Sequence, residues 1–120
     1  MQWNVEYTDT FETWWIEQTD ALQNDIAAVV ALLEERGPEL PHPYSSSVNG
    51  SRHGHMRELR IQHAGSPYRI LYAFDPQRSA ILLLGGCKRG RDRWYEINVP
   101  LADTLYDEHL DTLKDEGLIP

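Results

Sequence analysis

The residues best suited to chemistry lie between residues 52 and 93, a cationic stretch within an acidic chain. This stretch carries a charge of +6, whereas residues 1–51 carry −8 and residues 94–120 carry −6. Its basic residues are Arg52, Arg57, Arg60, Arg69, Arg78, Lys88, Arg89, Arg91 and Arg93. Clustered cations bind polyanions, and the arginine fork can hold two phosphate oxygens at once. We therefore expect a local phosphate-binding surface despite the overall charge of −8.

Arg69 lies on a predicted strand in which aromatic residues alternate with others, so its side chain points away from the aromatic face. Arg57 and Arg60 lie on another predicted strand at odd spacing, so their side chains face opposite sides and only one can easily join Arg69. We expect Arg57 to join Arg69. Arg60 is then either a further phosphate contact or a structural partner of Glu58 or of the acidic helices.

The turn after the last predicted strand supplies further cations. Lys88 and Arg89 follow Gly85–Gly86, where the lack of side chains would let a phosphate approach the backbone. Arg91 and Arg93 extend the positive charge toward the next element. We expect this turn to be part of the same anion-binding surface.

Proton transfer is harder to assign, because free lysine titrates near ~10.4 and is a poor base at neutral pH. Histidine is better suited, and we expect His55, just before the first strand of the meander, to lie near the cationic stretch. His53 and His55 alone are a weak metal signal, so we expect no metal and no other cofactor. Asp107, Glu108 and His109 are consecutive helix residues that face different directions, which favours a solvated or partner-facing surface.

Hydrophobic spacing indicates the elements that must position these residues. Alternation predicts a strand within residues 2–7, and helical spacing predicts two helices over residues 8–37. Residues 37–55, rich in Pro, Ser, Gly and His, are expected to be a surface loop. A last amphipathic helix starts at Pro100 and ends near Gly117, whereas residues 92–99 fit either a helical turn or an extended lead-in.

Three strands are expected between the loop and the last helix, joined as an antiparallel meander. Their predicted ranges are Met56–His63, Tyr68–Asp75 and Ser79–Gly85. The third is apolar on both faces, so it should lie centrally in the sheet and be covered on both sides.

Length and composition predict one domain over residues 1–120. Cys87 is the single cysteine, so no intramolecular disulfide can form, which suits a reducing cytoplasm. The sequence holds no run of apolar residues long enough for a membrane span. We expect a cytoplasmic protein without a membrane partner.

Several motifs together resemble the RelE/HigB superfamily of bacterial toxins, in its phage-derived HigB-type branch. They are Phe11, Trp14 and Trp15, then MRELR at 56–60, YRILYAFD at 68–75, LLLGGCKRG at 82–90, WY at 94–95 and ADTLYDEHL at 102–110. The resemblance implies an α+β, RelE-like fold of order β-α-α-β-β-β-α, with an antiparallel meander packed against helices.

The resemblance also implies a function, that of the toxin of a type II toxin–antitoxin pair. Such toxins are endoribonucleases that cut mRNA, usually at the ribosomal A site, without a metal. Arg69 matches the arginine of the family's middle strand. The catalytic residues expected from the resemblance are Arg57, Arg69, Lys88, Arg89 and Tyr95, and the expected RNA contacts are His55, Arg60, Arg91 and Arg93. Lys88 or Arg89 matches a basic residue paired with a later tyrosine, here Tyr95, which would stack on a base or donate its hydroxyl. For Tyr95, core packing beside Trp94 is the alternative.

The partners implied by the resemblance are mRNA, the ribosome and a cognate helix-turn-helix antitoxin of the HigA type. DNA would be contacted only indirectly, through that antitoxin. Two other functions stay open from the residues. One is a ParE-like inhibitor of a protein target such as gyrase, and the other is an inactive remnant that only binds its antitoxin. The acidic flanks depart from the basic charge usual for RelE-type toxins and should confine RNA attraction to the cationic stretch.

Overall fold

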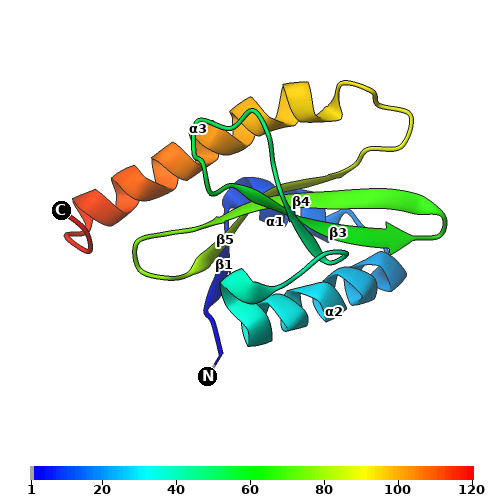
Figure 1. Cartoon of the computed structure of the whole chain (residues 1–120), viewed down its shortest axis with the longest axis horizontal. Helices are drawn as coiled ribbons and strands as arrows, with labels where there is room; N and C mark the ends of the chain where they lie inside the picture. The colour runs from blue at the N-terminus through cyan, green and yellow to red at the C-terminus, as the bar shows by residue number, and fades with distance from the viewer. Residues whose placement is uncertain (1) are drawn as a thin grey trace.

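The computed structural model describes residues 2–120 as one β-sheet between two layers of helices (Figure 1). Met1, part of the predicted domain, lies outside the described residues. Within residues 2–120 the sheet has five strands in the order β1-β5-β4-β3-β2. They are β1 (Val5–Tyr7), β2 (Ser45–Ser47), β3 (Arg57–His63), β4 (Ser66–Phe74) and β5 (Ala80–Cys87). Strand β1 runs parallel to β5, and the other neighbours are antiparallel, so the predicted α+β class and the meander are confirmed.

Helices cover both faces of this sheet. The helices α1 (Asp9–Ile16) and α2 (Asp20–Arg36) pack on one face, and α3 (Trp94–Asp115) crosses the other (Figure 1). A short 3₁₀ helix, η1 (Gly37–Glu39), follows α2. Thr8 and Thr19 cap α1 and α2 by accepting hydrogen bonds from backbone N–H groups. Along residues 2–120, no helix has both the length and the apolar character needed to cross a bilayer.

Each face of the sheet has its own core, which explains the burial pattern of the strands. Ile70 and Tyr72 of β4 pack on the side of α1 and α2, whereas Leu71 and Ala73 pack under α3. Strand β5 lies between β1 and β4 and is buried on both sides. The central place predicted for its apolar run is therefore confirmed.

A register shift in β5 decides which face the following residues use. Leu71 and Tyr72 of β4 lie opposite Leu84 and Leu82, so β5 has one extra residue at this point. Because side chains alternate along a strand, one extra residue moves everything after it to the opposite face. Gly86 thus lies opposite Arg69 and packs against Trp94 of α3.

The prediction of a plain surface loop over residues 37–55 was wrong in part. This segment contains η1 and also β2, which pairs with β3. Pairing with β2 satisfies backbone groups at the edge of β3 that would otherwise lack partners. Buried Ser45 also shares a hydrogen bond of 2.7 Å with the Tyr72 hydroxyl. Beyond β2 the chain is held on α3, where buried Asp103 accepts hydrogen bonds from Ser51 Oγ and from the Arg52 amide.

The last helix begins at Trp94 and not at Pro100 as predicted. Residues 94–99 are therefore helical, and Pro100 lies inside the helix although it cannot donate a backbone hydrogen bond. Trp94 and Val99 are buried against the sheet. This packing outweighs the preference of proline for a first turn.

Candidate functional site

A buried carboxylate and three cations meet on the α3 side of the sheet. Arg60 of β3 lies directly opposite Arg69 of β4, so both side chains leave the same face. Glu58, two residues before Arg60, shares that face. Lys88 and Tyr95 close the group from the end of β5 and the start of α3. We call these five residues the Glu58 cluster.

Glu58 lies in the middle of the cluster, with only 4% of its surface exposed. Its Oε2 accepts hydrogen bonds from Ser46 Oγ at 2.7 Å and Arg60 Nη1 at 3.1 Å. Its Oε1 accepts the hydroxyl of Tyr95 at 2.5 Å. A buried carboxylate is costly unless it is paired, and here three donors hold it.

Arg69 is fixed in the sheet, with 5% of its surface exposed. Its Nη1 donates to the carbonyl oxygen of Tyr68 at 2.9 Å. Its Nε lies 3.7 Å from Glu58 Oε1, which is an ion pair but too long for a good hydrogen bond. Within the described residues, this buried Nε has no hydrogen-bond partner. Because this Nε is closed to solvent beside Glu58, an anion can meet only the part of the guanidinium that lines the pocket at β3.

Tyr95 is placed by the first turn of α3. Its neighbour Trp94 is buried and contacts the Tyr95 ring edge-on, with centroids 5.2 Å apart. Burial, followed by the hydrogen bond to Glu58, raises the pKa of the Tyr95 phenol above its ordinary value. The phenol is therefore neutral at physiological pH and donates to the carboxylate.

Lys88 lies over the ring of Tyr95, with Nζ 5.3 Å from the ring centroid. Partial burial and the nearby charge of Arg69 lower the pKa of the Lys88 ammonium. A lowered pKa makes this ammonium a stronger proton donor than a free lysine. Lys88, Arg60 and Arg69 carry three positive charges against one negative charge on Glu58, so the cluster suits an anion.

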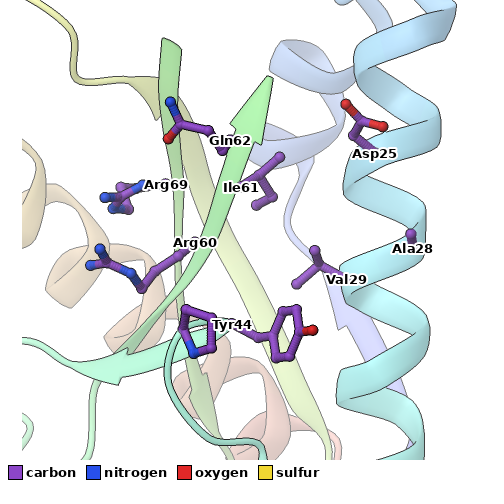
Figure 2. A pocket seen from close by; sticks show the side chains of 9 residues that line it. Asp25, Ala28, Val29, Tyr44, Arg60, Ile61, Gln62 and Arg69 are labelled. Carbon is purple, nitrogen blue, oxygen red and sulfur yellow. The ribbon is translucent and has the colours of Figure 1, made fainter. Parts of the chain in front are cut away.

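A pocket of about 420 Å³ opens where Arg60 and Arg69 reach the outer edge of β3. Figure 2 shows Arg60 and Arg69 on one side of this strand, and Asp25 and Val29 of α2 on the other. The remaining lining residues are Ala28, Pro43, Tyr44, Ile61 and Gln62. Strand β2 begins at Ser45, opposite Leu59, and the Arg60 amide still donates to the Tyr44 carbonyl at 2.8 Å, so β3 is left as a sheet edge from Ile61 onward. The two arginines can therefore be approached from this edge.

The predicted grouping of Arg57 with Arg69 was wrong. Arg57 lies opposite Tyr72, on the face covered by α2, where its Nε donates to Ser45 Oγ at 3.0 Å. Arg60 lies beside Arg69 instead. It also forms an ion pair with Glu58, which was one of the two roles expected for it. The odd spacing of the two arginines did predict that only one could join.

The other predicted cations lie at the rim. Arg89 is exposed and donates to Ser66 Oγ at 3.2 Å, at the start of β4. Arg91 is exposed, and Arg93 pairs with Glu96 at 2.9 Å on the surface. The glycines before Lys88 serve packing and not phosphate approach, because a Cβ on Gly86 would lie 3.0 Å from the Trp94 ring.

His55 lies away from the Glu58 cluster, which contradicts its predicted place near the RNA-binding cations. Its Nε2 is 3.3 Å from the Tyr106 hydroxyl, which in turn donates to the carbonyl of Phe74. Phe74 is five residues along β4 from Arg69, about 16 Å at the usual rise of a strand. His55 and its neighbour His53 pack against Tyr106 and help to hold the loop on α3.

Asp107 and His109 of α3 also hold neighbouring segments on the helix. Asp107 accepts hydrogen bonds from Arg52 and His53, and His109 contacts buried Asp75 at 2.8 Å. These contacts tie the loop and the β4–β5 turn to the helix. Among residues 2–120, no three His, Cys, Asp or Glu side chains gather in a way that could hold a metal ion.

Sequence reasoning undervalued Glu58, which it treated only as a partner for Arg60. The signal was the alternation in 56–60, which places Glu58 and Arg60 on one strand face. Ser46 was missed because three consecutive serines in a polar loop do not indicate a strand.

This sheet order, with two helices on one face and a C-terminal helix on the other, is the RelE-type fold. An archaeal RelE in complex with RelB, from Pyrococcus horikoshii, superposes with a TM-score of 0.55 at 17% identity, covering 76% of this chain and 99% of that one. A free mutant of the E. coli toxin RelE gives a TM-score of 0.57 at 11% identity, covering 80% and 94%. At these identities the likeness shows the fold.

The chain belongs to the family of phage-derived Gp49-like proteins (DUF891), whose model matches residues 13–107. It is 45% identical over 93 residues to the putative toxin HigB3 of Mycobacterium tuberculosis, covering 77% of this chain and 80% of that protein. It is 46% identical over 92 residues to the putative toxin HigB2 of the same organism, covering 75% of this chain and 46% of HigB2. The chain thus spans about half the length of HigB2. These matches confirm the resemblance to the RelE/HigB superfamily that the motifs indicated.

Proposed function

We propose that this protein is the toxin of a type II toxin–antitoxin pair and that it is an endoribonuclease. The family match, the two relatives named as putative toxins and the RelE-type fold support the toxin role. The Glu58 cluster carries the proposal of RNA cleavage, because it combines fixed cations with groups able to exchange protons. In this proposal residues 1–120 act as a single toxin domain.

The chemistry proposed is attack of an RNA 2′-hydroxyl on the neighbouring phosphate. Two fixed arginines on one face, Arg60 and Arg69, would stabilise the negative charge that builds on the pentavalent phosphorus. The ammonium of Lys88, whose pKa is lowered, would donate a proton to the leaving 5′-oxygen. The side chains supply the positive charge in this scheme, so it requires neither a metal ion nor an organic cofactor.

The substrate proposed is mRNA in the ribosomal A site, in the cytoplasm. Cleavage by the 2′-hydroxyl needs an in-line arrangement that flexible RNA rarely adopts, and the ribosome can hold the message in place. The acidic flanks weaken the long-range attraction of free RNA and of ribosomal RNA alike, so binding would depend on the local cationic cluster. Arg89, Arg91 and Arg93 are proposed as rim contacts to the RNA backbone.

The partner proposed is a cognate antitoxin of the helix-turn-helix, HigA type, through which the pair would contact its operator DNA. RelE-type chains are found in complexes with RelB in the archaeal and E. coli structures that share this fold. The second E. coli structure superposes with a TM-score of 0.52 at 10% identity, covering 70% of this chain and 94% of that one.

The test is cleavage of a defined message on translating bacterial ribosomes, with cut sites mapped by primer extension. Wild-type protein should cut at A-site codons, and the Arg69→Met variant should not. Methionine is chosen because it replaces the buried aliphatic part of the arginine side chain without its charge. Arg36→Ala removes an exposed arginine at the end of α2 and should leave cleavage unchanged. Intact RNA with a folded wild-type protein would refute the ribonuclease. Growth arrest without cleavage would then favour a ParE-like inhibitor, and no arrest would favour an inactive remnant.

A further inference from the structure

We infer that the pocket between β3 and α2 holds the base next to the phosphate bound by Arg60 and Arg69, and that Asp25 selects a base with an exocyclic amino group. This inference rests on the proposed function, because it names an RNA contact that would decide where the message is cut. The pocket reaches the side of β3 that is turned toward α2, whereas the Glu58 cluster lies on the side of α3 (Figure 2).

The pocket has opposite charges at its two ends. Arg60 and Arg69 line it on one side of β3, and Asp25 lines it on the other side, at the surface of α2 (Figure 2). The Nε of Arg69 is closed off beside Glu58, so an anion reaches this guanidinium through the pocket. A nucleotide has the matching polarity, with a negative phosphate at one end and, in three of the four RNA bases, an amino donor at the other.

Apolar side chains separate the two charged ends. They are Ala28 and Val29 of α2, Ile61 of β3 and the ring of Tyr44 (Figure 2). Tyr44 is 42% exposed, and an exposed aromatic ring is a platform on which any base can stack. The volume of about 420 Å³ lies within the usual range for small-ligand pockets, about 300–1,000 Å³, so a single nucleotide is of suitable size.

Asp25 supplies hydrogen-bond acceptors and no donor. Its Oδ2 lies 2.6 Å from Nδ1 of His63, which leaves Oδ1 for a second donor. An ionised carboxylate only accepts hydrogen bonds, so it can bind the amino group of adenine, cytosine or guanine. Uracil has a carbonyl oxygen where cytosine has its amino group, and two acceptors that face each other repel. The pocket should therefore disfavour uracil.

The free edge of β3 suits a base better than a peptide strand. The Arg60 amide donates outward to the Tyr44 carbonyl, so by alternation the backbone groups of Gln62 also point outward. Gln62 lies opposite Pro67, which has no N–H group. Since β3 ends at His63, Gln62 is the last residue of the strand whose backbone is directed outward. Addition of a strand needs a row of such groups, whereas one N–H and one carbonyl are enough to meet the edge of a base.

The first measurement is single-turnover cleavage, on translating ribosomes, of messages that differ in one base next to the cut. The base on each side of the cut is changed in turn to each of the four bases, for wild type, Asp25→Asn and Tyr44→Leu. Glu35→Gln and Tyr7→Leu are matched controls, which change an exposed carboxylate on α2 and an exposed tyrosine on β1. Asparagine keeps the size of Asp25 and adds a donor for the uracil carbonyl. Thermal unfolding shows that each variant is folded.

At one of the two positions, wild type should cut the uracil message at least about fivefold more slowly than the other three, the lower limit of what a base contact supplies. In Asp25→Asn this difference should shrink to less than about twofold, whereas a merely structural loss would slow all four messages equally. Tyr44→Leu should slow all four by about fivefold or more, because stacking is tolerant of sequence. Equal cutting of the four messages by wild type, or the same uracil ratio in Asp25→Asn, would overturn the inference while leaving the ribonuclease intact.

The second measurement is NMR of the free protein with cytidine 3′-monophosphate and with uridine 3′-monophosphate. The cytidine compound should shift the amides of Asp25, Tyr44 and Gln62 and bind more tightly than the uridine compound, and Asp25→Asn should remove that difference. Equal binding of the two, or shifts confined to the α3 side of the sheet, would overturn the inference. Shifts at Gln62 with an extended hexapeptide, KTVTVK, but with neither nucleotide would also overturn it, because this edge would then bind protein.

The nucleotides bind without a ribosome, so the two measurements fail separately. Absence of cleavage by a wild type that still prefers the cytidine compound at these residues would refute the proposed ribonuclease but not the base pocket.

Discussion

Replacing Arg69 by methionine should abolish cleavage yet cost only a modest amount of stability. Removing one partner of a buried ion pair ordinarily costs about 3–5 kcal/mol, because the other charge is left uncompensated. Here Glu58 would keep the donors Arg60, Ser46 and Tyr95. The ion pair that is lost is long, at 3.7 Å, and Arg69 Nε makes no hydrogen bond within the described residues.

The expected loss is therefore the bond from Arg69 Nη1 to the Tyr68 carbonyl plus a weak ion pair, about 1–2 kcal/mol in total. For a domain of this size that corresponds to a fall in Tm of roughly 4–8 °C. Urea unfolding of the purified protein measures this loss in the free energy of unfolding. Arg36→Met is the control, because Arg36 is exposed and its replacement should change stability by less than about 0.5 kcal/mol. A loss of about 4 kcal/mol or more would show that Arg69 is mainly the structural counter-ion of Glu58. That result would refute the proposal that Arg69 serves to bind an anion.

Three further changes test the packing and the charges. Gly85→Ala should destabilise the fold by about 1–3 kcal/mol in urea unfolding, because the new Cβ would lie 2.6 Å from the Trp14 ring; unchanged stability would contradict that packing. Lys88→Arg should move the alkaline limb of the cleavage–pH profile upward, since burial lowers the pKa of Lys88 and activity is lost as pH rises through that value; a limb at the same pH would exclude Lys88 as the proton donor. Asp107→Asn should reduce thermal stability at neutral pH, and the difference should vanish in acid. The hydrogen bond from Arg52 lowers the folded pKa of Asp107, so its contribution is present above its unfolded pKa of about 3.9 and is lost as pH falls through the lower folded value.

The sheet and its layers were predictable because hydrophobic periodicity reports burial. The run 80–84 is apolar on both faces, and this alone placed β5 in the centre of the sheet. The first turn of α3 was left open between a helical turn and an extended lead-in, because Pro100 is a local signal, whereas Trp94 and Val99 are held by a sheet that is distant in sequence. The strand β2 was missed for the same reason, since its three serines gain order only by pairing with β3.

The members of the candidate site could be predicted as residue types but not as a group. Alternation along β3 requires Arg57 and Arg60 to face opposite sides, but which of them meets Arg69 depends on the register with β4. The face on which the Lys88 side chain lies depends on the extra residue in β5, which moves Lys88 to the side of α3. A register and a bulge are set by pairing between strands, so composition and spacing within one strand do not fix them.

The position of Glu58 explains how a chain of charge −8 can carry a local cationic cluster. Three cations packed together without a counter-ion would repel one another and weaken the fold. One buried carboxylate between Arg60 and Arg69 relieves that repulsion and still leaves the cluster with a net positive charge. The carboxylate holds these cations through its negative charge as well as through its hydrogen bonds. A glutamine keeps the hydrogen-bonding oxygen but loses the charge, so Glu58→Gln should lower the stability measured by urea unfolding, and unchanged stability would contradict this role for Glu58.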